Sequence, residues 1–305
     1  MKKSISPYPI QSIQEFHFLM QLPEPKAPLI SLVRFEDIKE IPTSVPKSLI
    51  LPFFSLWLKK DYQGGRLKYG QQIYDFDAGS MSFFEEGQLF DYDEGEVSHR
   101  GWWLMIVPEF ILQSPLASTI RQRGFFSYSI HEALHLSDAE EMIIDEIMQK
   151  IDWEITHSMD DCSPKIIISY VELLLNYAER FYNRQFMTRK TVTNELVDRL
   201  NRLLDDWLNN RILENEKLPS VKVVSQQLNV STNYLSDMLK RITGKTTLQH
   251  IHDKLIETAT IKLSTTNMTI SEISYELGFE HPQSFAKLFK NKTNISPNQF
   301  RRNLQ

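Results

Sequence analysis

The stretch ISEISYELGFEHPQSFAKLFKNKTNISPNQFRR, residues 270–302, decides how the C-terminal third of this chain folds. Its first apolar residues recur three to four positions apart, and the Gly278 that follows them tolerates the left-handed conformation that ends a helix. Pro282 suits the first position of a second helix, whose apolar residues again fall on one face. Two short helices joined by a tight turn predict a helix-turn-helix motif at residues 270–292.

An earlier stretch, VSQQLNVSTNYLSDMLKRITG at residues 224–244, repeats this pattern. Asn229 stands where the second copy has Gly278, and it also tolerates the left-handed conformation. Ser231 is placed to cap the next helix, and the second copy has one extra residue in its turn. The repeat predicts a first helix-turn-helix motif at residues 221–243. Two motifs with matching helix breakers are a much stronger signal than one.

A single long helix is predicted between the two motifs, at residues 246–264. Its apolar residues stand at helical spacing: Leu248, Ile251, Leu255, Ala259 and Leu263. A helix of about 18 residues is roughly 27 Å long at about 1.5 Å per residue. Such a rod can hold two reading helices about one turn of DNA apart, roughly 34 Å.

Charge divides the 305-residue chain, whose formal net charge is −5. Residues 211–305 hold 13 Lys and Arg against 8 Asp and Glu, a net charge of +5, which leaves −10 for residues 1–210. A basic segment on an acidic body favours an anionic partner, and with the tandem motifs that partner is double-stranded DNA. An all-helical protein-interaction domain is the alternative for this segment.

Residues 219–303 resemble the DNA-binding domain of AraC/XylS-type bacterial transcriptional regulators. The resemblance is carried by Ile273-Ser274, by Gly278-Phe279 at the turn, by Phe-x-Lys-x-Phe-Lys at 285–290, by Ser296-Pro297, and by Phe300 followed by arginine. This sequence has Asn294 where the family usually has glycine, and Ser274 where alanine is usual.

The DNA-contacting residues are expected on the faces of the two reading helices that point away from their apolar sides. They are Thr232, Asn233, Ser236, Asp237, Lys240 and Arg241 in the first motif, and Gln283, Ala286, Lys287 and Lys290 in the second. Asn and Gln side chains suit adenine, Asp suits the cytosine amino group, and Lys287 suits guanine. Lys240, Arg241 and Lys290 are expected on phosphates. The alternative for each residue is an ordinary solvated position.

The segment from about residue 16 to residue 110 is rich in strand formers broken by Gly, Pro and Asp, which predicts a β-barrel or sandwich. The family resemblance implies a cupin-like sensor of a small-molecule effector here, assigned to residues 1–160. Aromatic residues either line its cavity or fill its core: Phe53, Phe54, Trp57, Tyr74, Phe83, Phe84, Trp102 and Trp103. Because His99 stands alone, without a His-x-His pair, no metal and no other cofactor is expected.

Residues 161–210 return to helical periodicity. Apolar faces are formed by Ile167, Val171, Leu174 and Ala178, and then by Leu196, Leu200, Leu203 and Trp207. One face is expected to pack on the barrel and the other to pair two subunits in a homodimer. The predicted fold class is therefore α+β multidomain: a cupin-like barrel, a helical dimerisation segment at 161–210, and an all-α tandem helix-turn-helix domain at 211–305, with its boundary near Asn209 to Leu218.

These features favour a ligand-responsive, sequence-specific transcriptional regulator that reads two adjacent major-groove segments. No apolar run reaches the roughly 20 residues of a membrane span, no signal peptide is seen, and the single cysteine, Cys162, excludes an internal disulfide. A cytoplasmic location and no membrane contact are expected, with RNA polymerase as a further candidate partner. A regulator controlled by a protein partner instead of a small molecule is the alternative.

One motif points elsewhere: His131-Glu132-Ala133-Leu134-His135 is an H-E-x-x-H sequence. On a helix this spacing binds zinc and would make the chain a metallopeptidase. However, Ser137 and Glu140 fit a capping box, which predicts that the helix begins only after His135. We therefore expect no enzyme activity, and we interpret the motif as a connection from the barrel to the helix.

Overall fold

The computed structural model describes residues 7–38, 45–60, 79–91, 100–157, 159–188, 190–210 and 218–303. Tyr74, His99 and most of the expected boundary between Asn209 and Leu218 lie outside these residues. The chain divides into two compact units, 1–185 and 186–305. Helix α5 (Ser163–Thr188) crosses the division.

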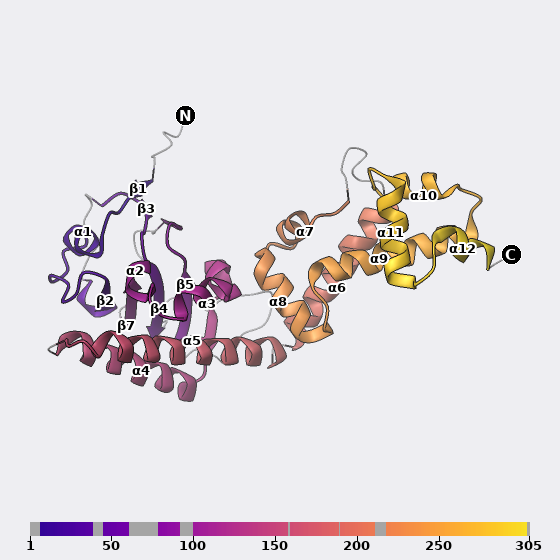
Figure 1. Ribbon diagram of the computed structural model, residues 1–305. Helices are drawn as coiled ribbons and strands as arrows, with labels where there is room; N and C mark the ends of the chain where they lie inside the picture. Colours follow the sequence, from indigo (N-terminus) through magenta and orange to yellow (C-terminus); the bar gives the residue numbers. More distant parts are fainter. Residues whose placement is uncertain are drawn as a thin grey trace. The chain divides into compact units, whose positions relative to one another are not determined.

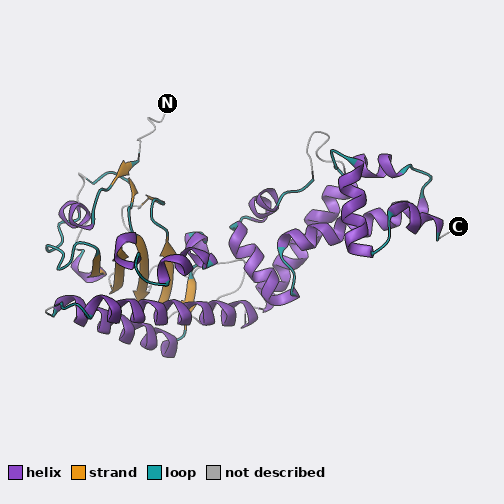
Figure 2. Ribbon diagram, in the orientation of Figure 1, coloured by secondary structure: helices purple, strands orange, loops and turns teal. Residues whose placement is uncertain are grey.

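The N-terminal unit contains two sheets (Figures 1 and 2). The larger is antiparallel, in the order β2-β7-β4-β5-β8: Ile30–Arg34, Arg100–Ile106, Phe54–Lys60, Gly79–Phe84 and Leu134–Leu136. The smaller has the order β1-β3-β6: Tyr8–Pro9, Ser48–Ile50 and Leu89–Asp91. The predicted strand-rich region is confirmed, whereas the described strands do not show a closed barrel.

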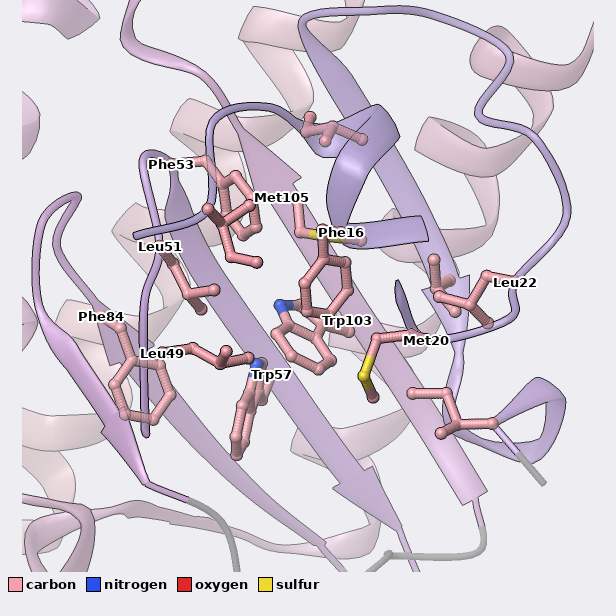
Figure 3. Packing of buried hydrophobic residues seen from close by; sticks show 14 of the residues in the cluster. Phe16, Met20, Leu22, Leu49, Leu51, Phe53, Trp57, Phe84, Trp103 and Met105 are labelled. Carbon is pink, nitrogen blue, oxygen red and sulfur yellow. The ribbon is translucent and has the colours of Figure 1, made fainter. Parts of the chain in front are cut away.

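One face of the larger sheet packs against helix α1 (Ile13–Leu19) and the smaller sheet. Figure 3 shows this cluster, where Phe16 of α1 meets Trp103 of β7 and Trp57 of β4 lies beside Phe84. The ring centroids are 4.8 Å apart in the first pair and 4.7 Å in the second. Because strand side chains alternate between faces, Trp57 and its pairing partner Trp103 both enter this cluster.

The opposite face of the sheet is covered by α4 (Asp138–Thr156) and α5, which run along it in Figure 1. The Asp145 carboxylate of α4 accepts hydrogen bonds from Trp102 Nε1 at 2.7 Å and from Lys60 Nζ at 2.6 Å, which ties the helix to β7 and β4. From α5, the ring of Tyr182 contacts Phe83. The seven described aromatic residues predicted to line or fill the domain are all buried, and they divide between the two faces.

Short helices complete the N-terminal unit: η1 Phe35–Asp37, α2 Pro108–Ile111, α3 Leu116–Thr119, η2 Ile120–Gln122, η3 Gly124–Ser127 and η4 Ile130–Glu132. Helix α4 begins directly after Ser137, whose hydroxyl accepts from the backbone of Glu140 while the Glu140 carboxylate accepts from the backbone of Ser137. The predicted capping box and helix start are confirmed.

The C-terminal unit is helical. After α6 (Lys190–Asn210), its helices are α7 Val221–Leu228, α8 Thr232–Thr243, α9 Thr247–Thr265, α10 Ile270–Glu276, α11 Pro282–Thr293 and α12 Pro297–Arg302. Helix α9 is the long connecting helix, and both reading helices, α8 and α11, pack on it. Of its five apolar residues at helical spacing, four are buried, whereas Leu248 is 48% exposed and the neighbouring Thr247 is buried instead.

Helix α6 packs within the C-terminal unit, against α7 and α9. Arg199 Nη2 donates to the Leu228 carbonyl at 3.2 Å, and Asp205 forms an ion pair with Lys254 of α9 at 2.6 Å. Leu204, rather than the predicted Leu203, is buried on its inner face.

Candidate nucleic-acid interface

The first reading helix, α8, is positioned by the caps at the turn before it. Asn229 ends α7 in the left-handed conformation, with φ 58° and ψ 43°. Ser231 then caps α8, since its hydroxyl accepts from the backbone N–H of Tyr234 at 3.2 Å. Both roles were predicted from the sequence, and both are confirmed.

The second reading helix, α11, is set by equivalent devices. Gly278 has φ 89°, and Pro282 occupies the start of α11, where its missing N–H costs nothing. Each reading helix ends on a left-handed residue: Gly244 with φ 74° in the first motif and Asn294 with φ 63° in the second. Asparagine therefore fills the usual glycine position in the predicted conformation.

The inner faces of the reading helices are buried as predicted, except for the half-buried Leu288: Leu235, Met238 and Leu239 in α8, and Phe285 and Phe289 in α11. Ser225 and Ser274, which occupy equivalent positions in α7 and α10, are also buried. The Ser225 hydroxyl donates to the Lys222 carbonyl at 3.0 Å, whereas the Ser274 hydroxyl has no partner among the described residues.

The ten predicted DNA-contacting residues differ in exposure. Six are exposed: Asn233, Lys240, Arg241, Gln283, Lys287 and Lys290. Four are half-buried: Thr232, Ser236, Asp237 and Ala286. The Ser236 hydroxyl lies 3.0 Å from Thr247 Oγ1 of α9, so the protein already engages it. A DNA contact at each of the ten positions stays a prediction.

Four exposed cations of the reading helices differ from four other lysines of the unit because they form no ion pair with a described acid. No ion pair joins these cations to any described acid: Lys240, Arg241, Lys287 and Lys290. Four other lysines are paired with acids: Lys245, Lys254, Lys262 and Lys292. The reading helices therefore present uncompensated positive charge, which is what phosphate contacts require.

Polar contacts along α9 hold the two motifs to it, and no pattern in the sequence indicated them. Thr243 Oγ1 of α8 lies 2.7 Å from His250 Nε2. Asp253 accepts from Lys245 Nζ and Lys292 Nζ, each at 2.7 Å. Burial raises the pKa of the Asp253 carboxyl, but the hydrogen bonds from the two lysines outweigh it, so the pKa is lowered overall. These partners lie 8 and 39 residues from Asp253, beyond any local pattern.

Arg301 of α12 donates hydrogen bonds to the segment that joins α9 to α10. Its Nη1 donates to the Met268 carbonyl at 2.6 Å, and its Nε donates to the Leu263 carbonyl at 3.4 Å. This arginine therefore satisfies carbonyls at the C-terminal end of α9 and in the following loop. Its place in the sequence motif has a structural explanation.

The H-E-x-x-H sequence does not lie on one helix. His131 and Glu132 are in the 3-10 turn η4, whereas His135 is in strand β8 and pairs with Ser80 of β5. The Glu132 carboxylate accepts from the backbone N–H of Ser129 at 2.7 Å, so it caps η4. The spacing that gives two histidines one ligand face on a helix does not operate here, and the described residues hold no group of three or more candidate ligands for a metal ion.

Helix α5 is the partner of this connection. Tyr182 Oη donates to the Glu132 carbonyl at 3.2 Å, and Gln185 Oε1 accepts from the backbone N–H of His135 at 2.8 Å. The motif therefore connects the sheet to α5, in line with the structural interpretation of it.

Among the described helices, none is both long and apolar enough to cross a membrane.

Comparison with known proteins supports the assignment of the C-terminal unit. A family model for a helix-turn-helix domain matches residues 224–303. The chain is similar to the HTH-type transcriptional regulator YdeC of Bacillus subtilis, with 23% identity over 72% of this chain and 74% of that protein. It is 33% identical to the arabinose operon regulatory protein of Escherichia coli over 26% of this chain and 27% of that protein.

A third relative is histidine kinase P4 of Formosa agariphila, 27% identical over 44% of this chain. The matched region spans only 10% of that kinase. The matches to the kinase and to the arabinose regulator thus concern a part of each protein.

The two capped motifs, the connecting helix and the family match define the C-terminal unit as a helix-turn-helix DNA-binding domain. The domain at residues 224–303 is of the AraC type, and the relatives of the chain include regulators of the AraC/XylS family. Proteins of this family are generally not enzymes.

Proposed function

We propose that the protein is a ligand-responsive, sequence-specific transcriptional regulator that reads two adjacent major-groove segments with α8 and α11. In this proposal residues 1–160 sense the effector, residues 161–210 connect the parts and pair two copies, and residues 211–305 bind DNA. The protein has no enzyme activity and acts in the cytoplasm, where the DNA is, with RNA polymerase as a further partner.

The observation that carries the DNA-binding part is the charge on the reading helices. Lys240 and Arg241 on α8, and Lys287 and Lys290 on α11, are exposed and form no ion pair with a described residue. An unpaired surface cation releases counterions from DNA without first breaking a pair in the protein. Asn233 and Gln283, exposed on the same helices, supply the amide groups suited to adenine.

Trp57 supports an effector in the N-terminal unit. Its ring lies among Phe35, Phe84 and Trp103, and it is 7% exposed. The indole Nε1 has no hydrogen-bond partner among the described residues, although a buried N–H normally has one. An apolar effector with one acceptor atom would satisfy it.

Pairing of two copies is supported by apolar side chains exposed on α5, within residues 161–210, and on α4, which precedes that segment. Met142 and Trp153 of α4 are 63% and 57% exposed, and Leu173 of α5 is 43% exposed. Large apolar side chains on neighbouring helices favour burial against a partner surface. Sedimentation at micromolar concentration tests this, and a monomer that binds DNA fully would contradict it.

The test of the DNA-binding proposal compares two lysines of one helix. Lys290→Ala should weaken binding to all sequences alike and lower the slope of log affinity against log salt by about one. Lys287→Ala should weaken binding at one subset of operator positions, by a factor of roughly 5 to 100 for a guanine contact. Equal effects of both variants on specificity would contradict the assignment.

Control by a protein partner is the alternative to a small effector, and the exposed apolar side chains of α4 and α5 equally suit it. A thermal-shift screen of the full chain against small metabolites separates the two. The effector proposal predicts a shift that Trp57→Phe reduces, because phenylalanine lacks the indole N–H. Absence of any shift, with tight binding of a protein to α4 and α5, would favour the alternative.

A further inference from the structure

Asp253 lies in the N-terminal half of α9 and uses both of its carboxylate oxygens. Oδ2 accepts from Lys245 Nζ and Oδ1 accepts from Lys292 Nζ. Lys245 follows Gly244, the C-cap of the first reading helix, and Lys292 lies in the last turn of the second. One carboxylate therefore joins the C-terminal ends of the two motifs.

The other side-chain contacts between α9 and the helices of the two motifs each hold a single motif. At its beginning, Thr247 and His250 contact Ser236 and Thr243 of α8. At its far end, Lys262 forms an ion pair with Glu276 of α10 at 3.0 Å. Because these contacts lie at opposite ends of α9, they attach each motif to the helix separately. The contact at Asp253 is shared by both motifs, so it resists rotation of one against the other about α9.

The three side chains of this cluster are placed to act together. Asp253 is 32% exposed, Lys292 30% and Lys245 54%, so solvent weakens both ion pairs without removing them. A single exposed pair changes an equilibrium by no more than about fivefold. Two pairs on one carboxylate cannot hold the domain folded, but they can select among nearby orientations of two motifs that are already folded.

We propose that Asp253 is a positioning residue for DNA recognition, which fixes the rotation of α11 relative to α8 and thereby sets the spacing of the two half-sites that the chain accepts. The inference rests on the proposed function, since it concerns how that function becomes selective. Asp253 itself contacts the protein and not a base.

The test uses two duplexes. The first is the sequence that the wild-type full chain selects from a random DNA pool, and the second carries one inserted base pair between its two half-sites. One base pair turns the second half-site by about 34° and moves it by about 3.4 Å. The measured quantity is the spacing ratio, which is the dissociation constant for the second duplex divided by that for the first. This ratio cancels any general change in affinity.

Asp253→Asn should lower this spacing ratio by about three- to tenfold, because the second motif can follow the displaced half-site. Lys292→Gln removes one arm of the same cluster and should lower the ratio in the same direction. Glu257→Gln is the matched control: it removes the same charge from α9, but its ion-pair partner, Lys254, lies on α9 itself. Its ratio should equal that of the wild type.

An unchanged ratio in both Asp253→Asn and Lys292→Gln would overturn the inference. The same holds if Asp253→Asn raises affinity for every duplex by the same factor, because Asp253 would then act only as a charge. A wild-type chain that selects no sequence would contradict the proposed function itself, and the inference would fall with it.

Discussion

The two equivalent serines of the repeat allow a matched test of the packing. Ser274 of α10 is fully buried and its hydroxyl has no hydrogen-bond partner among the described residues, whereas the hydroxyl of Ser225 in α7 donates to the Lys222 carbonyl. A buried hydroxyl without a partner costs about 1–3 kcal/mol, and a satisfied hydrogen bond contributes about 1 kcal/mol. Ser274→Ala should therefore stabilise the domain, and Ser225→Ala should destabilise it.

Comparing Ser274→Ala with Ser225→Ala cancels the effects on stability that the two substitutions share. Alanine has the higher helix propensity by roughly 0.5 kcal/mol, and this gain applies to both variants since both serines are helical. The difference between the two variants then rests on the hydroxyl alone and amounts to about 2 kcal/mol, or roughly 30-fold in the opening equilibrium.

Hydrogen exchange of the full chain, read by mass spectrometry on peptides from α7 and α10, measures this equilibrium within the C-terminal unit. Slower exchange in Ser274→Ala than in Ser225→Ala is expected throughout the unit. Equal exchange in the two variants, or faster exchange in Ser274→Ala, would refute the assignment of an unsatisfied hydroxyl at Ser274.

Two further predictions concern the N-terminal unit. Gly101→Ala should prevent correct pairing of β7 with β4, because a Cβ there would lie 1.9 Å from the Leu58 carbonyl oxygen at φ +132°. Gly87→Ala, where a Cβ meets nothing within 4 Å, should cost only about 1 kcal/mol of backbone strain, so circular dichroism and melting temperature should separate the two. Burial lowers the pKa of His17 from 6.5, and the unfolded chain therefore takes up the proton first. Stability contributed at His17 is present above pH 6.5 and is lost as the pH falls below it, so His17→Gln should flatten the melting temperature between pH 7 and pH 5. An unchanged slope would contradict this.

Much of the C-terminal unit could be predicted because its signals are local. A helix end at Asn229 or Gly278, and a helix start at Ser231 or Pro282, depend on one residue and its immediate neighbours. For the same reason, the start of α4 was predicted correctly. A four-residue capping box that begins at Ser137 indicates that the helix starts after the H-E-x-x-H sequence.

What a pattern cannot show is which element covers an apolar face. The periodicity of α6 indicated a buried side, yet only the structure shows that α7 and α9 cover it. Leu248 fitted the helical period of α9 but lies in its first turn, where Thr247 faces α8 instead. No local pattern marks Asp253, because its two partners are brought to it by the tertiary fold.

In the proposed function, one chain reads two neighbouring half-sites with α8 and α11. A hydroxyl-radical footprint of the purified full chain on its selected duplex tests it most directly. If α8 and α11 each read one half-site, each chain should give two protected patches, about one helical turn or roughly 34 Å apart on the same face of the duplex. A single protected patch per chain, or two patches on opposite faces, would contradict it.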